Sequence, residues 1–255
     1  LLTDLVIPNS VTNIGDSAFE GCTSLTSVTI PNSVTKIGDS AFDCSSLTSV
    51  SIGNSVTEIG YRAFAGCTLL TSVTIPNSVT NIGENAFYDC RLLTSVTIPD
   101  SISKISASAF YGCSSLKNIT LPESVNEIGF AAFVGAGLRA LTILNPNPPS
   151  VQDNAFLDPN PENIALYVPA ESVELYRKTE PWSRFKSVNA VDTAIKGVEV
   201  EADVAVSVCG AEIVVPEGSK IFDLKGRTMR ATKLPVGVYI VRTPSGKTVK
   251  VTIAL

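Results

Sequence analysis

The sequence predicts a solenoid of parallel β-strands with short helical turns and loops elsewhere, followed by a small all-β sandwich domain. The first observation is a phenylalanine that recurs every 22 or 23 residues, at Phe19, Phe42, Phe64, Phe87, Phe110, Phe133 and Phe156. The second is the phrase I-P-N-S-V-T-x-I-G-x-x-A-F-x-x-C-x-x-L-T-S-V-T that surrounds it. A unit this short cannot bury its own apolar side chains, so we expect the copies to stack on one another.

Each repeat contains a strand signal and two turn signals. Leu25, Val28 and Ile30 form an apolar pattern that alternates at its end, which is typical of a short strand. Pro31 and the Asn-Ser pair after it favour a turn, and residues 39–42 suit a short helical turn. One strand per repeat, stacked in parallel, predicts a sheet along one face with strands about 4.7–4.9 Å apart.

The pattern divides the chain into three parts. We predict the repeat solenoid at residues 1–143, a C-terminal cap at 144–190 and a small β-sandwich at 191–255. The cap prediction includes a strand at residues 166–169, a short helix at 170–179 and a linker that starts at Asn189. Tyr176, Trp182 and Phe185 are expected to cover the open end of the core, although Trp182 could instead offer its ring to a ligand. In the last part, short apolar runs separated by glycines predict antiparallel strands.

Two segments resemble known families. The repeats over roughly residues 1–143 resemble bacterial leucine-rich repeats of the BspA-like class, whose units read close to S-V-T-x-I-G-x-x-A-F-x-x-C-x-x-L-T-S-V-T-I-P. This resemblance implies a curved right-handed leucine-rich-repeat solenoid of bacterial origin, displayed on the cell surface or secreted, that adheres to host or partner proteins. The phrase I-F-D-L-K-G-R at 221–227 and L-P-V-G-V-Y-I-V at 234–241 resemble type IX secretion sorting domains of Bacteroidetes. That second resemblance implies export and anchoring; the alternative is an immunoglobulin-like spacer.

Composition excludes several functions. The 255 residues contain no histidine, so histidine-based triads, general bases and metal ligands are absent. We therefore expect no enzyme, no metal and no cofactor. The net charge of −5 argues against nucleic-acid partners, and no apolar run is long enough for a transmembrane segment. We expect a monomer whose signal segment lies upstream of Leu1.

One candidate surface follows from the strand segments. Val28 and Ile30 should point inward, so Ser27 and Thr29, which alternate with them, should point outward on the concave face. Down the stack, the outward Ser and Thr side chains would form a ladder of hydroxyl groups. This hydroxyl ladder is either a recognition surface or the result of the ordinary preference for Thr on solvent-facing strands. The candidate contacts are Ser27, Thr29, Ser49, Ser51, Ser72, Thr74, Ser95, Thr97, Asn118 and Thr120.

A second candidate surface lies beside the phenylalanine column, where the repeats vary. Tyr88, Arg91 and Tyr111, with Arg62 nearby, form the predicted protein-contact patch, because Tyr and Arg are enriched at binding hot spots. Ordinary surface variation is the alternative interpretation.

Five cysteines are expected to share one repeat position, at Cys22, Cys44, Cys67, Cys90 and Cys113. A linear column cannot form a tetrahedral metal site, and buried free thiols are preferred over occasional disulfides. The repeat that starts at Ile30 is one residue short, and we place the gap between Phe42 and Cys44. Another repeat column should pair Lys36 with Glu58 and Lys104 with Glu127 as exposed ion pairs.

The combined prediction is a non-enzymatic bacterial surface or secreted repeat protein, an adhesin that binds host or microbial proteins through the solenoid. The first alternative is carbohydrate binding, which the hydroxyl ladder favours and the lack of predicted exposed aromatic rings disfavours. The second alternative is a passive spacer, because near-identical repeats offer little to a specific ligand.

Overall fold

The computed structural model describes residues 2–191 and, in the C-terminal part, residues 207–209, 212–214, 220–223, 228–229, 237–242 and 248–253. The chain divides into two compact units, Leu1–Val191 and Asp192–Leu255. Within the described residues, no helix is long and apolar enough to cross a membrane.

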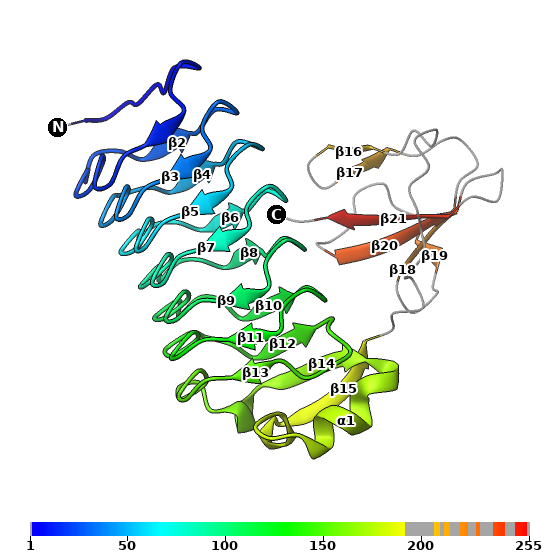
Figure 1. The fold of residues 1–255 in the computed structure, drawn as a ribbon. Helices are drawn as coiled ribbons and strands as arrows, with labels where there is room; N and C mark the ends of the chain where they lie inside the picture. Colours follow the sequence, from blue (N-terminus) through cyan, green and yellow to red (C-terminus); the bar gives the residue numbers. More distant parts are fainter. Residues whose placement is uncertain are drawn as a thin grey trace. The chain divides into compact units, whose positions relative to one another are not determined.

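The first unit is a solenoid in which successive turns of the chain stack as parallel strands (Figure 1). One face holds strands of three to five residues: β2 (Ser27–Thr29), β4 (Ser49–Ser51), β6 (Ser72–Thr74), β8 (Ser95–Thr97), β10 (Asn118–Leu121), β12 (Ala140–Ile143), β14 (Ala165–Pro169) and β15 (Ser187–Val191). A second row holds two-residue strands: β1 (Asn13–Ile14), β3 (Lys36–Ile37), β5 (Glu58–Ile59), β7 (Asn81–Ile82), β9 (Lys104–Ile105), β11 (Glu127–Ile128) and β13 (Ser150–Val151). The predicted parallel stacking is confirmed.

The register repeats without a shift along the regular part of the stack. Val28 pairs with Val50 on the long strands, and Ile37 pairs with Ile59 on the short ones. Each repeat position therefore stands on its own equivalent in the next turn, so a side chain that fits once fits in every copy.

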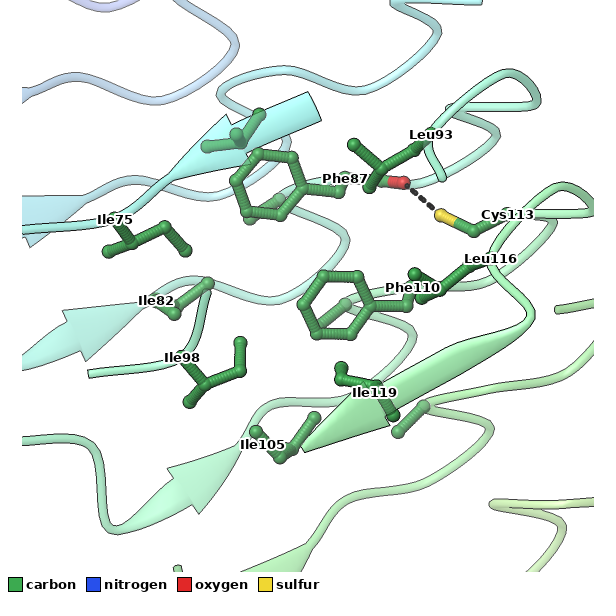
Figure 2. Packing of buried hydrophobic residues seen from close by; sticks show 14 of the residues in the cluster. Ile75, Ile82, Phe87, Leu93, Ile98, Ile105, Phe110, Cys113, Leu116 and Ile119 are labelled. Carbon is green, nitrogen blue, oxygen red and sulfur yellow. Dashed lines mark hydrogen bonds between the residues drawn. The ribbon is translucent and has the colours of Figure 1, made fainter. Parts of the chain in front are cut away.

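The core is a column of phenylalanine rings flanked by aliphatic side chains. Neighbouring rings from Phe19 to Phe156 stack with centroids 5.2–5.7 Å apart and interplanar angles of 2–18°. Figure 2 shows Phe87 above Phe110, with isoleucines and leucines of the same repeats around them. Burial of this apolar column is the main source of stability, because one repeat alone would expose it.

The segment around each phenylalanine is a hydrogen-bonded turn that replaces the expected short helical turn. Ser40 adopts a left-handed conformation with φ of 52°. Its amide and that of Phe42 donate to carbonyl oxygens of the next repeat, at Tyr61 and Ala63, over 2.7 and 2.8 Å. The intervening amide of Ala41 donates within the turn to Gly38. Alternate amides thus join neighbouring turns, which a helix would not permit.

Aromatic side chains cover the C-terminal end of the column. The segments there are η1 (Pro161–Asn163), η2 (Ala170–Ser172), α1 (Val173–Lys178) and η3 (Trp182–Arg184). Trp182 is fully buried, packs edge-on against Phe156 and donates from its indole nitrogen to the Pro149 carbonyl at 3.1 Å. It therefore offers no ring face to a ligand, which removes that alternative.

Two details of this segment differ from the prediction. The strand expected at 166–169 is β14, but it is not the last one, because β15 pairs with it in parallel. Asn189 and Val191 belong to β15 and pair with Tyr167 and Pro169, so the expected linker cannot begin at Asn189. Sequence reasoning missed β15 because no repeat phrase precedes it.

The second unit contains antiparallel strands. They are β16 (Ser207–Cys209), β17 (Glu212–Val214), β18 (Lys220–Asp223), β19 (Thr228–Met229), β20 (Gly237–Arg242) and β21 (Thr248–Ile253). The order β19-β18-β20-β21 forms one sheet, and β16 pairs with β17. The first of the apolar runs that predict strands in this part, at 198–200, lies outside the described residues, and the sandwich remains a prediction.

Candidate functional site

The long strands present the predicted hydroxyl ladder to solvent. In β2 and β6 the central valine is buried and the flanking Ser and Thr are exposed. All ten predicted contacts, from Ser27 to Thr120, are exposed in this way. We call this surface the strand face, defined by these ten residues together with Ala140 and Thr142.

A shallow hollow of about 590 Å³ lies over the last strands of the strand face. Its lining includes Thr97, Thr120 and Thr142, and it ends at Tyr167, which pairs with Thr142 and is 37% exposed. The repeat phrase predicts no exposed aromatic ring on this face. Tyr167 was missed because β14 lies beyond the last clear repeat phrase, although the register puts it in the threonine column.

On the other surface, the structure brings three of the four predicted patch residues together. The rings of Tyr88 and Tyr111 stack with centroids 4.8 Å apart and an interplanar angle of 9°. The guanidinium carbon of Arg62 lies 5.8 Å from the Tyr88 ring centroid, within the range of a cation–π contact. These three residues form the aromatic patch, which extends across three consecutive repeats.

A buried carboxylate holds the arginine in place. Asp43 is only 5% exposed, and its Oδ2 accepts a hydrogen bond from Arg62 Nε at 2.8 Å. This bond raises the pKa of the guanidinium above its ordinary value. Asp43 also accepts from the Cys44 thiol at 3.2 Å, which raises the pKa of Cys44. The arginine head is therefore fixed at one end and lies over the Tyr88 ring.

Arg91 has a different partner. It forms two hydrogen bonds with Asp89 of the same turn, at 2.7 and 2.9 Å, and its side chain is 64% exposed. Exposed pairs of this kind contribute about 0–1 kcal/mol, so Arg91 is free to exchange partners.

Exposed apolar side chains also occur in the loops of these repeats. Leu69 and Leu92 occupy the same position in adjacent repeats and are 43% and 46% exposed. Tyr61 and Phe130 are also about half exposed. The repeat phrase allows any residue at these positions, and only the structure separates them from the buried leucines next to them. The turn side is defined here as the aromatic patch together with Arg91, Leu69 and Leu92.

The cysteine column also lies on this side of the molecule. Three thiols donate to the carbonyl oxygen of the phenylalanine one repeat earlier, each over 3.2 Å, as Figure 2 shows for Cys113 and Phe87. They belong to Cys67, Cys90 and Cys113. Burial raises the pKa of Cys67 to about 11 and that of Cys113 to about 12, so these thiols are protonated and unreactive at neutral pH.

Cys44 does not belong to that column, which corrects the prediction. Ser45 takes the buried position: its amide donates to the Phe42 carbonyl at 3.3 Å, and its hydroxyl lies 3.2 Å from Cys67 Sγ. Cys44 is exposed, with φ of 55°, in the position that Gly66 occupies one repeat later. The missing residue therefore falls after Ser45 and not between Phe42 and Cys44. Cys22 is only partly buried, so the expectation of five buried thiols is wrong for two of them.

The predicted ion pairs lie on the short-strand row. Lys36 contacts Glu58 at 3.2 Å and Lys104 contacts Glu127 at 2.9 Å, both well exposed. Within the described residues, no group of three or more Cys, Asp or Glu side chains could hold a metal ion.

Comparison with known proteins identifies the repeats. The model of the BspA-type leucine-rich repeat region matches residues 1–93 and 36–163, in six copies. A solved leucine-rich repeat protein from Eubacterium ventriosum is 33% identical over 53% of this chain and 37% of its own length, with a TM-score of 0.50. This chain therefore spans well under half of that protein. No match was found among curated proteins.

Two further solved structures are less similar to this chain than the E. ventriosum protein is. A leucine-rich repeat protein from T. pallidum is 31% identical over 50% of this chain and 71% of its own, with a TM-score of 0.40. A leucine-rich cell surface protein from Faecalibacterium prausnitzii is 25% identical over 77% and 56%, with a TM-score of 0.42. The family match covers more than half of the chain and agrees with the stacked register described above, so the chain belongs to the BspA-type leucine-rich repeat family.

Proposed function

We propose that this protein is a non-enzymatic bacterial surface or secreted adhesin that binds a host or microbial protein through the turn side of its solenoid. Leucine-rich repeat solenoids present extended surfaces to protein partners. The F. prausnitzii protein is described as a cell surface protein, which supports the same location for this chain.

The observation that supports this proposal best is the aromatic patch. Tyr88, Tyr111 and Arg62 are preassembled, with one end of the arginine fixed by a buried carboxylate. Side chains held in place before binding lose little conformational entropy on contact, and Tyr and Arg are the residue types that most often dominate binding energy. Leu69 and Leu92 add apolar area beside repeats that are otherwise uniform.

The test is binding of the full chain to a panel of extracellular-matrix proteins and glycans by surface plasmon resonance. We expect a saturable protein ligand whose affinity falls at least tenfold in Tyr88→Ala/Tyr111→Ala. The matched control is Thr74→Ala/Thr97→Ala on the strand face, which should bind as the wild type does. If the threonine control lost ligand binding and the tyrosine variant kept it, the binding site would lie on the strand face. The absence of any ligand would favour the passive spacer.

For the last part of the chain, we propose export and anchoring by a sorting domain at residues 191–255. The support is the sequence phrase at 221–227 and 234–241. A reporter fused to residues 191–255 should reach the surface of a bacterium that has type IX secretion and stay inside a mutant that lacks it. Surface delivery in neither strain would contradict the proposal.

A further inference from the structure

A hollow of about 560 Å³ lies where the chain enters the last long strands. Three cations line it: Lys117 and Arg139, directly before β10 and β12, and Lys186, directly before β15. One acidic group, Asp158, is in the lining. The earlier repeats have threonines in this column, at Thr26, Thr48, Thr71 and Thr94.

Backbone pairing fixes the spacing of the three cations. The amide of Arg139 donates to the Lys117 carbonyl at 2.8 Å, so these two residues stand in adjacent turns. The next turn has the buried Ile164 in this column, and Lys186 follows one turn later. Two strand spacings, about 10 Å, therefore separate the backbones of Arg139 and Lys186, with the hollow between their side chains.

Half of the cations in residues 2–191 form no ion pair there, and three of these five line the hollow. Residues 2–191 contain ten Lys and Arg and seventeen Asp and Glu, and five of the ten cations form ion pairs. Within the same residues, the side chains of Lys117, Arg139 and Lys186 form none, although acidic groups outnumber basic ones. Three cations without an ion pair, against the single carboxylate of Asp158, leave a net positive potential at the hollow that an anion would relieve.

Local backbone chemistry also keeps the ammonium of Lys117 at the rim. Its Nζ donates to the Ser114 carbonyl at 2.7 Å and lies against Gly137. A side chain at Gly137 would collide with this Nζ and with the Ser114 carbonyl. The glycine therefore leaves the space in which the ammonium sits.

The neighbouring surface indicates what kind of anion would fit. The residues that follow the cations, Asn118 and Ala140, already line the hollow on the strand face, with Thr120, Thr142 and the exposed ring of Tyr167 beyond them. A strand rises about 3.3 Å per residue, so a chain of two or three sugar rings would extend from Lys117 to this ring. Hydroxyl groups and an aromatic face suit sugar rings, whereas an acidic peptide would gain nothing specific from them.

We propose that the C-terminal end of the solenoid binds a sulfated polysaccharide, with the sulfates on Lys117, Arg139 and Lys186 and the sugar rings along Thr120, Thr142 and Tyr167. Arg and Lys form charge-assisted hydrogen bonds with such oxyanions. This site is distinct from the aromatic patch and does not depend on the protein-binding proposal.

The experiment measures binding of the full chain to heparin, desulfated heparin, dextran and poly-L-glutamate at physiological ionic strength. We expect heparin to bind, desulfated heparin to bind more weakly and dextran not to bind, with affinity falling as salt rises. Lys117→Ala/Arg139→Ala/Lys186→Ala should lower heparin affinity about tenfold. The control Lys36→Ala/Lys178→Ala/Arg184→Ala changes net charge equally, lies outside the hollow and should bind as the wild type does.

Tyr167→Ala separates a saccharide site from a general anion site, because it should weaken heparin binding and leave poly-L-glutamate unaffected. Equal losses in the two triple variants would overturn the proposal, as would the absence of heparin binding. Tighter binding of poly-L-glutamate, insensitive to Tyr167→Ala, would also overturn it, in favour of an acidic protein partner. Circular dichroism of each variant checks that the solenoid is folded.

Discussion

The strand face and the turn side are built on the same phenylalanine column but differ in how their residues vary. The strand face repeats Ser and Thr from β2 to β8, whereas the position after the phenylalanine, which Tyr88 of the turn side occupies, changes from Asp43 to Ala65 to Tyr88 in consecutive repeats. Pairing in parallel strands requires a β-compatible residue at each strand position, while the turns require only a compatible backbone. Variation is therefore concentrated where the stack tolerates it, which is where we place the protein-binding surface.

The largest effect should come from the column that both surfaces share. Phe87→Ala removes a fully buried ring between two stacked neighbours, and we expect it to lower the free energy of unfolding by about 3–5 kcal/mol. Phe19→Ala is the matched control, since Phe19 is only partly buried and stacks on Phe42 alone in the described residues. Urea denaturation should show that Phe19→Ala loses roughly half as much free energy of unfolding as Phe87→Ala. Equal losses in the two variants would mean that burial and stacking on two sides do not set what a ring contributes to the free energy of unfolding.

A second prediction concerns the thiols beneath the turn side. Burial raises the pKa of Cys67 from 9.0 to about 11, so the folded state keeps a proton that the unfolded chain releases. The resulting stabilisation is complete below pH 9 and is lost as pH rises from 9 to 11, by up to about 3 kcal/mol. Cys67→Ala should lose less stability than the wild type over this interval. Ala136 already occupies the equivalent position, so the variant should fold. The prediction would be contradicted if the free energy of unfolding fell equally with pH in the wild type and in Cys67→Ala.

The smallest pair of effects compares the two surfaces directly. Arg62→Ala leaves the buried Asp43 without its cation and should cost about 1–3 kcal/mol. Thr74→Ala changes an exposed ladder residue and should stay within about 0.5 kcal/mol. Both are measured by urea denaturation at pH 7. If Thr74→Ala were the more costly change, the strand face would be under structural constraint and its uniformity would need no functional explanation.

The sequence predicts those features of the molecule that repeat. The phenylalanine spacing alone predicts the ring column, and the S-V-T alternation predicts which residues point outward. The position of the gap near Cys44 could not be predicted, because a deletion in the phrase fits at several points. Only the hydrogen bond from Ser45 to Phe42 distinguishes them.

Contacts between different repeat positions were also beyond the sequence. Arg62 and Tyr88 come from different positions of different repeats, and their contact depends on the left-handed backbone at Arg62. The hollow at Lys117 depends on residues 157–164, between Phe156 and β14, which follow no repeat phrase. The change from threonine to lysine in that column was visible, but its partner Lys186 was not.

The unshifted register makes the length of the solenoid adjustable. A duplicated copy of residues 75–97 would meet the same side chains above and below that the original meets, so no new interface would have to evolve. Each duplication would add one tyrosine ring to the aromatic patch and one strand spacing, about 4.8 Å, between Arg62 and the basic hollow, and would leave the hollow itself unchanged. Copy number alone would then set the length of the surface that a related protein presents to its ligand.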